Sequence, residues 1–166
     1  MQLIIAAAIA VVAALIEFTV APYVKIGGAI LHPVLVLGVS WAIAAGPEAG
    51  MAWAFVGGLT LVVLGQRPLG SSAFSMLIAI GIASAIGSAF GRARIAAPVV
   101  ATGVTSVLYS LVLLAVTTAL TNTTLPDRAL GLVVPSAIYD AVLALLVGPL
   151  AVATVMRWRP TERITW

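Results

Sequence analysis

Two acidic residues, Glu17 and Asp140, lie inside apolar runs of this chain and are the first candidates for a functional site. A carboxylate surrounded by apolar groups is costly unless it is hydrogen-bonded or paired, so each acid needs a partner, a cavity or a proton. The groups that could join them are His32, which is the only histidine, Arg67, and Tyr139, which directly precedes Asp140. We treat these five residues as a candidate partner-contact or buried polar site.

Catalysis by these groups is not expected. A serine–histidine–acid arrangement would have to use His32, and no serine or acid is placed by the sequence to join it. A metal site would require Glu17, His32 and Asp140 to converge in three dimensions, and the absence of cysteine removes thiolate ligands. Gly57-Gly58 is not followed by the lysine of a phosphate-binding loop. The sequence therefore predicts no enzyme, no metal site and no cofactor.

The composition is typical of a protein that lives in a lipid bilayer. Hydrophobic residues make up 63% of the chain and charged residues only 8%, whereas soluble domains carry about 25% charged residues. The net charge of +3 comes from basic residues scattered between apolar runs, which indicates membrane orientation and not nucleic-acid binding. Because no lysine or arginine precedes the first run, we expect a retained helix and not a cleaved signal peptide.

Six apolar runs predict six transmembrane helices in a single domain, since a crossing needs about 20 apolar residues for a hydrocarbon core about 30 Å thick. Proline, glycine and charged residues separate the runs, as at Pro22 and at Gly46-Pro47-Glu48. The second and third runs are short, so they form either short crossings or a re-entrant hairpin. The expected helices lie at about 3–21, 31–45, 49–64, 72–90, 96–120 and 132–156.

The distribution of basic residues favours an orientation with both termini in the cytoplasm. In that orientation Lys25, Arg67 and Arg128 lie outside, and a larger group lies inside, part of it in a basic cytoplasmic tail at 157–166. If the second and third runs form a re-entrant hairpin, two crossings are lost together and the other loops stay on the same sides. The predicted orientation is therefore the same in both cases. The inside residues are Arg92, Arg94, Arg157, Arg159 and Arg163.

The two acids differ in their expected depth. Glu17 stands near the proline that ends its helix, so we expect it near the outer interface. Asp140 is about eight residues into the last run, about 12 Å below its outer end, where an acid costs roughly 2.5–3.5 kcal/mol on insertion scales. Three interpretations of Asp140 stay open. It is a structural acid, either neutral and protonated or satisfied by neighbouring hydroxyls such as Ser136 and Tyr139. Otherwise it is a contact with a partner, or a site for a transported ligand or proton.

Small residues recur every four positions in the fourth run, at Ala79, Ala83, Gly87 and Gly91. Lipid supplies no hydrophobic drive between helices, so close backbone approach along such a face is one way for them to pack. The spacing predicts a helix-packing seam. In so alanine-rich a chain the same spacing also arises by chance, and that interpretation stays open.

Several motifs follow one another in a definite order along the whole chain. An apolar helix ends in a polar residue, and a glycine-containing link and a proline-led run of leucines follow it. A Gly-Leu pair then leads to a Pro-Leu-Gly turn, and the last helix carries a tyrosine and a polar residue before a basic tail. The segments are Leu15-Ile16-Glu17-Phe18-Thr19, Gly27-Gly28, Pro33-Val34-Leu35-Val36-Leu37, Gly57-Gly58-Leu59, Pro68-Leu69-Gly70, Pro135-Ser136-Ala137-Ile138-Tyr139-Asp140 and Arg157-Trp158-Arg159.

This order resembles the rod shape-determining membrane protein MreD family, although Glu17 and Asp140 stand where amides are commoner in that family. The resemblance implies a non-enzymatic membrane scaffold of the bacterial cell-elongation complex, located in the cytoplasmic membrane and supporting peptidoglycan synthesis. Such a subunit would bind MreC and, through it, help to position the polymerase RodA and its penicillin-binding partner relative to MreB filaments.

The same family is similar in fold to the S components of energy-coupling factor vitamin transporters. The resemblance therefore implies an all-α, S-component-like bundle of six transmembrane helices. A substrate-binding S component is the alternative function, and it would need an outward-facing pocket with converging polar and aromatic groups. A holin-like protein is a third class.

Overall fold

A computed structural model describes residues 2–25, 28–90, 96–122 and 127–157 of the chain. These residues form six α-helices and no β-strand. Four of the basic residues predicted to lie inside, and most of the predicted tail, lie outside the described residues; the four are Arg92, Arg94, Arg159 and Arg163. The helices are α1 (Gln2–Val20), α2 (Pro33–Ala45), α3 (Pro47–Gly65), α4 (Ser71–Phe90), α5 (Ala96–Thr121) and α6 (Asp127–Arg157).

The break predicted near Pro47 is a tight turn between α2 and α3. Gly46 adopts a φ of 108°, a conformation that favours glycine, and its backbone N–H donates to the carbonyl of Ala42 at 3.0 Å. Pro47 then occupies the first turn of α3, where the missing N–H costs nothing. Helix α3 runs for 19 residues, so it is longer than the short segment expected at 49–64, and only α2 is short.

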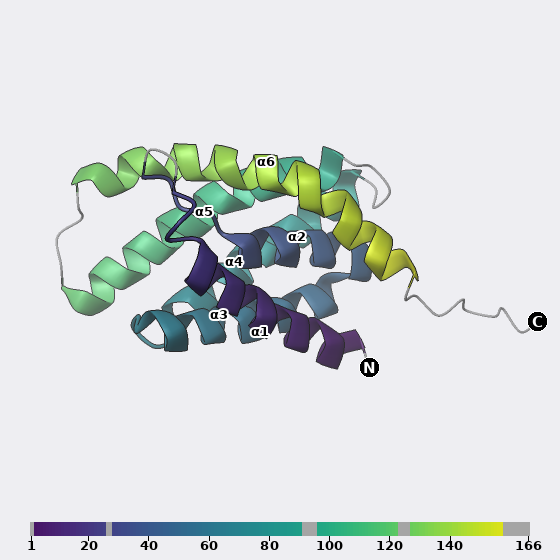
Figure 1. The fold of residues 1–166 in the computed structure, drawn as a ribbon, viewed down its shortest axis with the longest axis horizontal. Coiled ribbons are helices and arrows are strands. Elements are labelled where there is room, and N and C mark those ends of the chain that lie inside the picture. Colours follow the sequence, from purple (N-terminus) through teal and green to yellow (C-terminus); the bar gives the residue numbers. More distant parts are fainter. Residues whose placement is uncertain (1, 26–27, 91–95, 123–126, 158–166) are drawn as a thin grey trace, which may run out of the picture.

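Helix α2 is the centre of the bundle. It has 13 residues and is therefore about 20 Å long at about 1.5 Å per residue. Nine of its residues are buried, and it contacts each of the five other helices in the described structure. It begins at Pro33 and not at residue 31, because the preceding residues form an extended segment that runs along α6 (Figure 1). A helix this short depends on its neighbours to satisfy its ends.

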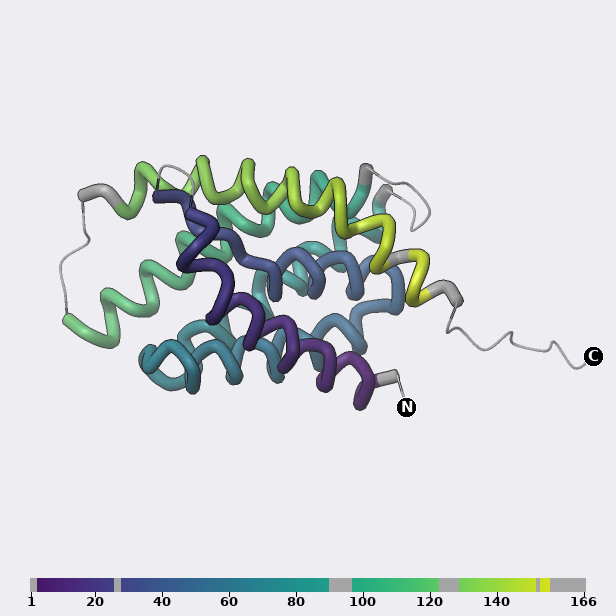
Figure 2. Tube along the Cα trace, viewed as in Figure 1, coloured from purple at the N-terminus to yellow at the C-terminus, as the bar shows by residue number. Residues whose placement is uncertain are grey.

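Successive helices run in alternating directions, so the start of α1 and the end of α6 lie at the same end of the bundle (Figures 1 and 2). Five of the described helices are long and apolar enough to cross a membrane, and α2 is the shorter exception. The chain is thus a multi-pass helical membrane protein, in agreement with the predicted class.

Helices α5 and α6 are the longest, with 26 and 31 residues. At about 1.5 Å per residue they measure about 39 and 46 Å, more than the roughly 30 Å of a hydrocarbon core. Helix α6 contains Pro135 and Pro149 in its interior. At the end of the bundle that holds the α3–α4 turn, the α5–α6 pair reaches beyond the other helices (Figure 1).

The predicted small-residue seam of α4 faces the interior. Ala79 and Ala83 are fully buried, and a Cβ added at Gly87 would lie 2.8 Å from Cγ1 of Ile43 in α2. Gly91 lies outside the described residues. The closest backbone approach in the bundle is made elsewhere, where a Cβ at Gly58 would lie 2.5 Å from the Cα of Ala73. Close packing therefore uses glycines of α3 as well as the predicted face of α4.

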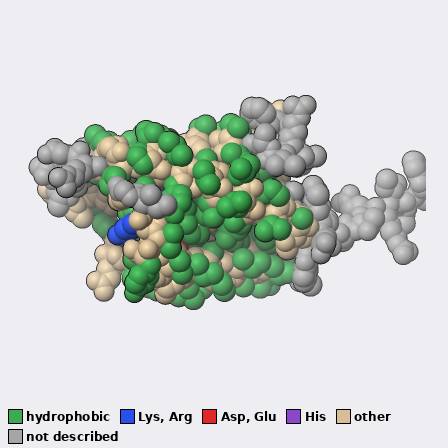
Figure 3. All heavy atoms as spheres, turned by 45° about the horizontal axis from the view of Figure 1, so that its top comes forward, with side chains coloured by type: hydrophobic (Ala, Val, Ile, Leu, Met, Phe, Trp, Pro, Cys, Tyr) green, Lys and Arg blue, Asp and Glu red, His purple; other side chains and the backbone are tan. Residues whose placement is uncertain are grey.

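The outer surface of the helices is strongly apolar. In Figure 3 hydrophobic side chains cover most of the described face, and blue atoms of a basic residue appear at one edge. Helix α6 alone exposes Val134, Ile138, Val142, Leu145, Leu146 and Leu150. Such a surface suits lipid tails or the transmembrane helix of a partner, and it would be a liability in water.

Candidate functional site at the start of helix α2

Asp140 of α6 is fully buried and is satisfied by three donors. Its Oδ1 accepts the backbone N–H of His32 at 2.8 Å, and its Oδ2 lies 2.9 Å from Nδ1 of the same residue. The hydroxyl of Ser106 in α5 donates to Oδ2 at 2.5 Å. A carboxylate buried among helices is tolerated when its lone pairs are filled in this way. Asp140 therefore joins α5 and α6 to the start of α2.

Asp140 does bind a hydroxyl, but from another helix, and the two sequence neighbours expected to satisfy it, Ser136 and Tyr139, bind elsewhere. The oxygen of Ser136 accepts the backbone N–H of Ile30 at 3.0 Å. Tyr139 points to the outside of the bundle, where its hydroxyl donates to the carbonyl of Val24 at 3.3 Å. Both side chains hold the segment between α1 and α2 against α6. Ser136 lies one turn from Asp140 on the same face of α6 but is engaged by Ile30, whereas Tyr139, the adjacent residue, leaves α6 in a different direction.

Glu17 of α1 is also buried, with 9% of its surface exposed, and it approaches the start of α2 from the opposite side. Its Oε2 accepts the backbone N–H of Val34 at 2.9 Å. The first N–H groups of a helix have no partner within the helix, and that end carries a partial positive charge. Two carboxylates, from α1 and α6, therefore bind the first residues of α2. The contact between Glu17 and the start of α2 is not part of the sequence prediction, and its position near the outer interface stays a prediction.

A third side chain fixes the same turn of α2. The indole Nε1–H of Trp53 in α3 donates to the carbonyl of Val34 at 3.0 Å, and the ring is fully buried. Trp53 also stacks on Trp41 of α2, with ring centroids 5.6 Å apart. Trp53 is not among the predicted site residues, although a buried tryptophan inside an apolar run usually has a hydrogen-bond acceptor.

His32 lies between Asp140 and a cavity, with 13% of its side chain exposed. Its ring meets the ring of Tyr109 edge-on, with centroids 5.3 Å apart. Burial alone would lower the pKa of His32, but the hydrogen bond and the charge of Asp140, together with the charge of Glu17, raise that pKa above its ordinary value of 6.5. These contacts therefore favour the protonated imidazole of His32 more than water does.

Arg67, in the turn after α3, is exposed and has no carboxylate within ion-pair distance among the described residues. Its Nη1 donates to the hydroxyl of Ser72 at 3.4 Å, which is a long contact. The hydroxyl of Tyr109 lies close to both side chains and makes no hydrogen bond of ordinary geometry with the residues described. Arg67 thus keeps most of its five donors free.

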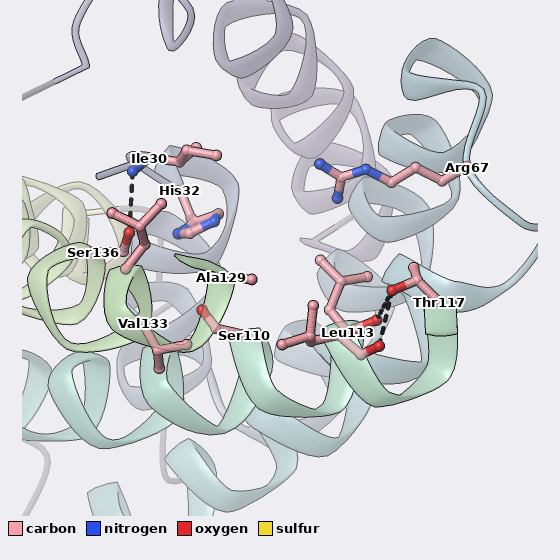
Figure 4. Close-up of a pocket in the computed structure, with 11 residues that line it drawn as sticks. Ile30, His32, Arg67, Ser110, Leu113, Thr117, Ala129, Val133 and Ser136 are labelled. Carbon is pink, nitrogen blue, oxygen red and sulfur yellow. Dashed lines mark hydrogen bonds between the residues drawn. The ribbon is translucent and has the colours of Figure 1, made fainter. Parts of the chain in front are cut away.

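Two cavities meet at Arg67. One, of about 320 Å³, is lined by His32, Ser110 and Ser136 together with apolar residues of α5 and α6 (Figure 4). The other, of about 650 Å³, is lined by Glu17, Tyr23 and Lys25 among others. Ile30 and Arg67 border both cavities. Of the five predicted site residues, Glu17, His32 and Arg67 line these cavities, Asp140 stands behind His32, and Tyr139 is turned away.

The arrangement of Ser106, His32 and Asp140 does not match that of a hydrolase. A nucleophilic serine must be hydrogen-bonded to its base, and the base to the acid. Here both the serine hydroxyl and the imidazole bind the same carboxylate oxygen, so the acid lies between them. Among the described residues no group of three histidine, cysteine or acidic side chains could hold a metal ion. The geometry shown is that of a cross-link between helices.

Comparison with known protein families, with curated proteins and with solved structures finds no match to this chain.

Proposed function

We propose that this protein is a non-enzymatic membrane scaffold of the bacterial cell-elongation complex, which binds MreC in the cytoplasmic membrane and supports peptidoglycan synthesis. The observation that carries this proposal is that both acids inside apolar helices bind other helices of the bundle. Asp140 and Glu17 bind the start of α2 and so hold the bundle together, an arrangement that suits a rigid subunit. The order of motifs that resembles the MreD family supplies the rest of the support.

The position of the helix ends supports the orientation that belongs to this proposal. The start of α1 and the end of α6 lie at one end of the bundle, with the turn between α2 and α3 (Figure 1). An even number of crossings with both termini in the cytoplasm would place Arg157 on the inside and Lys25 and Arg67 on the outside. The connection to MreB filaments, RodA and the penicillin-binding partner would then run through MreC.

Co-purification tests the proposal. A tagged chain is solubilised from native membranes, and MreC is expected in the eluate. Photo-crosslinking residues placed singly at exposed positions of three helices, Ile16, Val63 and Ile138, would show which lateral face meets the partner. MreC is expected to crosslink at one face and not at all three. An eluate without MreC, from cells in which MreC is present, contradicts the proposal.

A second candidate function, the substrate-binding S component of a vitamin transporter, is favoured by the two cavities. Their volumes lie in or near the range of small-molecule sites, about 300–1,000 Å³. Polar and aromatic side chains, among them Glu17, Tyr23, His32 and Arg67, line them. Mass spectrometry of the purified protein separates the two candidates: a retained vitamin-sized molecule together with a co-purifying ATPase indicates the transporter.

A further inference from the structure

The guanidinium of Arg67 is an unpaired cation within the described structure. It has no carboxylate within ion-pair distance among the described residues, and its one hydrogen bond, to Ser72, is long at 3.4 Å. Figure 4 shows the guanidinium reaching from the turn after α3 into the smaller cavity. A planar guanidinium binds phosphate and carboxylate groups through two parallel N–H donors.

The opposite wall of this cavity supplies two further polar groups. His32 faces Arg67 across the cavity in Figure 4. Its Nδ1 is bound to Asp140, so Nε2 remains for a ligand. The hydroxyl of Ser110, one turn of α5 beyond Ser106, makes no hydrogen bond within the described structure and lines the same cavity. Three donors from three different elements thus surround one space.

The remainder of the cavity is mainly apolar and lies between the projecting ends of α5 and α6. The hydroxyls of Thr117 and Ser136 also line it, and both are bound to backbone groups. Leu113 and Leu114 come from α5, and Ala129, Leu132 and Val133 come from α6. The volume of about 320 Å³ admits a headgroup and part of a chain. A site with cationic and hydroxyl groups at one side and leucines at the other is amphipathic, and it matches a ligand with the same two parts.

The two carboxylates near the smaller cavity, Asp140 and Glu17, are already hydrogen-bonded to other groups of the protein. Asp140 is shared by His32 and Ser106 and stands behind the imidazole. Glu17 is bound to the N–H of Val34 and lines the larger cavity, on the other side of Arg67. Neither carboxylate is among the residues that line the smaller cavity.

We propose that the smaller cavity is a binding site for an anionic amphiphile with a phosphate headgroup. Arg67 holds the phosphate through paired N–H donors, and His32 and Ser110 contribute one hydrogen bond each. The apolar chain lies along Leu113, Leu114 and Leu132, between α5 and α6. The site is independent of the scaffold function, because it requires neither MreC nor any other partner.

Binding of dodecyl phosphate to the purified protein in dodecyl maltoside tests the site, with affinity measured by isothermal titration calorimetry. Arg67→Gln removes the charge-assisted hydrogen bonds to the phosphate, so its affinity should fall at least about tenfold. The matched control is Lys25→Gln, which removes an exposed base bordering the larger cavity and should change the affinity less than about twofold. Circular dichroism and gel filtration confirm that each variant is folded.

If Arg67→Gln does not fold, Arg67→Lys replaces it; this variant keeps the charge, loses the paired donors and should bind several-fold more weakly. A folded wild-type protein that binds neither dodecyl phosphate nor inorganic phosphate overturns the proposal. So does an equal loss of affinity in the Arg67 variant and in Lys25→Gln, since that result would reflect surface charge alone.

A second pair of variants distinguishes a lipid headgroup from a free phosphate. Ala129→Trp fills the apolar part of the cavity. Leu130→Trp is the control, since Leu130 is exposed and does not line the cavity. If the ligand is an amphiphile, Ala129→Trp should weaken dodecyl phosphate at least tenfold and leave inorganic phosphate unchanged. Equal affinities for both probes in the wild-type protein, unaffected by Ala129→Trp, would assign the site to a free phosphate and overturn the apolar half of the proposal.

Discussion

His32 and Asp140 are joined twice, through the backbone N–H of His32 at 2.8 Å and through its Nδ1 at 2.9 Å, although 108 positions separate them in the chain. The bond to the backbone fixes where α2 begins. The bond to the ring fixes which way the imidazole faces. One carboxylate thus sets both the position of the central helix and the orientation of the polar group that borders the smaller cavity.

Removing the carboxylate of Asp140 should therefore loosen the whole bundle. Asp140→Asn keeps the size but replaces one carboxylate oxygen with an NH2 donor, so either the backbone N–H of His32 or the two donors on Oδ2 lose their acceptor. We expect a loss of about 1–3 kcal/mol in the free energy of unfolding. Asp140→Leu should cost more, about 3–5 kcal/mol, because it leaves a buried donor group and a charged partner unpaired. Thermal unfolding in detergent measures both variants. Glu48→Gln, at an exposed acid in the first turn of α3, is the control and should cost less than about 1 kcal/mol, the value of one charge at a helix N-terminus.

Glu17 should behave as an acceptor and not as a required charge. Glu17→Gln retains a side-chain oxygen for the N–H of Val34, so its unfolding free energy should change by less than about 1 kcal/mol. Glu17→Ala leaves that N–H without its partner and should cost about 1–3 kcal/mol. A glutamine variant as unstable as the alanine variant would show that the charge, and not the hydrogen bond, matters. Unfolding is measured as for the Asp140 variants.

The helical membrane class and the breaks at proline and glycine could be predicted from the sequence, because composition and backbone chemistry decide them locally. The partners of Asp140 could not. Each helix is apolar on almost every side, so its periodicity does not tell which face turns inward, and partners in other helices depend on that rotation. The expectation for Asp140 therefore used its sequence neighbours, Ser136 and Tyr139, which the fold directs elsewhere.

One signal in the sequence did contain the missing information. Thr102, Thr105, Ser106 and Tyr109 recur in α5 at the spacing of one helix face, and all four are buried. Hydroxyls gathered on one side of an otherwise apolar membrane helix indicate the face that meets other helices. That stripe identifies the side of α5 from which Ser106 reaches Asp140.

The two stacked tryptophans should differ in their contributions to stability. Trp53→Phe removes the donor to the carbonyl of Val34 as well as packing area. Trp41→Phe removes an indole N–H that has no partner within the described structure, so only packing area is lost. We expect Trp53→Phe to be more destabilising by about 0.5–1.5 kcal/mol, the net value of one hydrogen bond. Urea or thermal unfolding of the two variants side by side measures the difference, and equal losses would contradict it.

Stability should depend on pH through His32. Because the pKa of His32 is raised in the folded protein, its pairing with Asp140 stabilises the fold fully below the ordinary value of 6.5. That contribution is lost as the pH rises through the raised pKa. The melting temperature of the wild type should exceed that of His32→Gln most at pH 5.5–6, and the gap should narrow towards pH 9. A gap that widens with pH would show that the ring is neutral in the fold.

Glycines at close helix contacts should be intolerant of a methyl group, in contrast to glycines in open space. A Cβ at Gly58 would lie 2.5 Å from the Cα and 2.8 Å from the backbone nitrogen of Ala73, and backbone atoms cannot move aside as a flexible side chain can. Gly58→Ala should therefore push α3 and α4 apart and cost about 1–3 kcal/mol. Gly131→Ala is the matched control, since no atom lies within 4 Å of its added Cβ, and the gain in helix propensity should stabilise α6 by up to about 1 kcal/mol. Thermal unfolding of both variants measures the contrast, and a neutral Gly58→Ala would mean that α3 and α4 pack less closely than described.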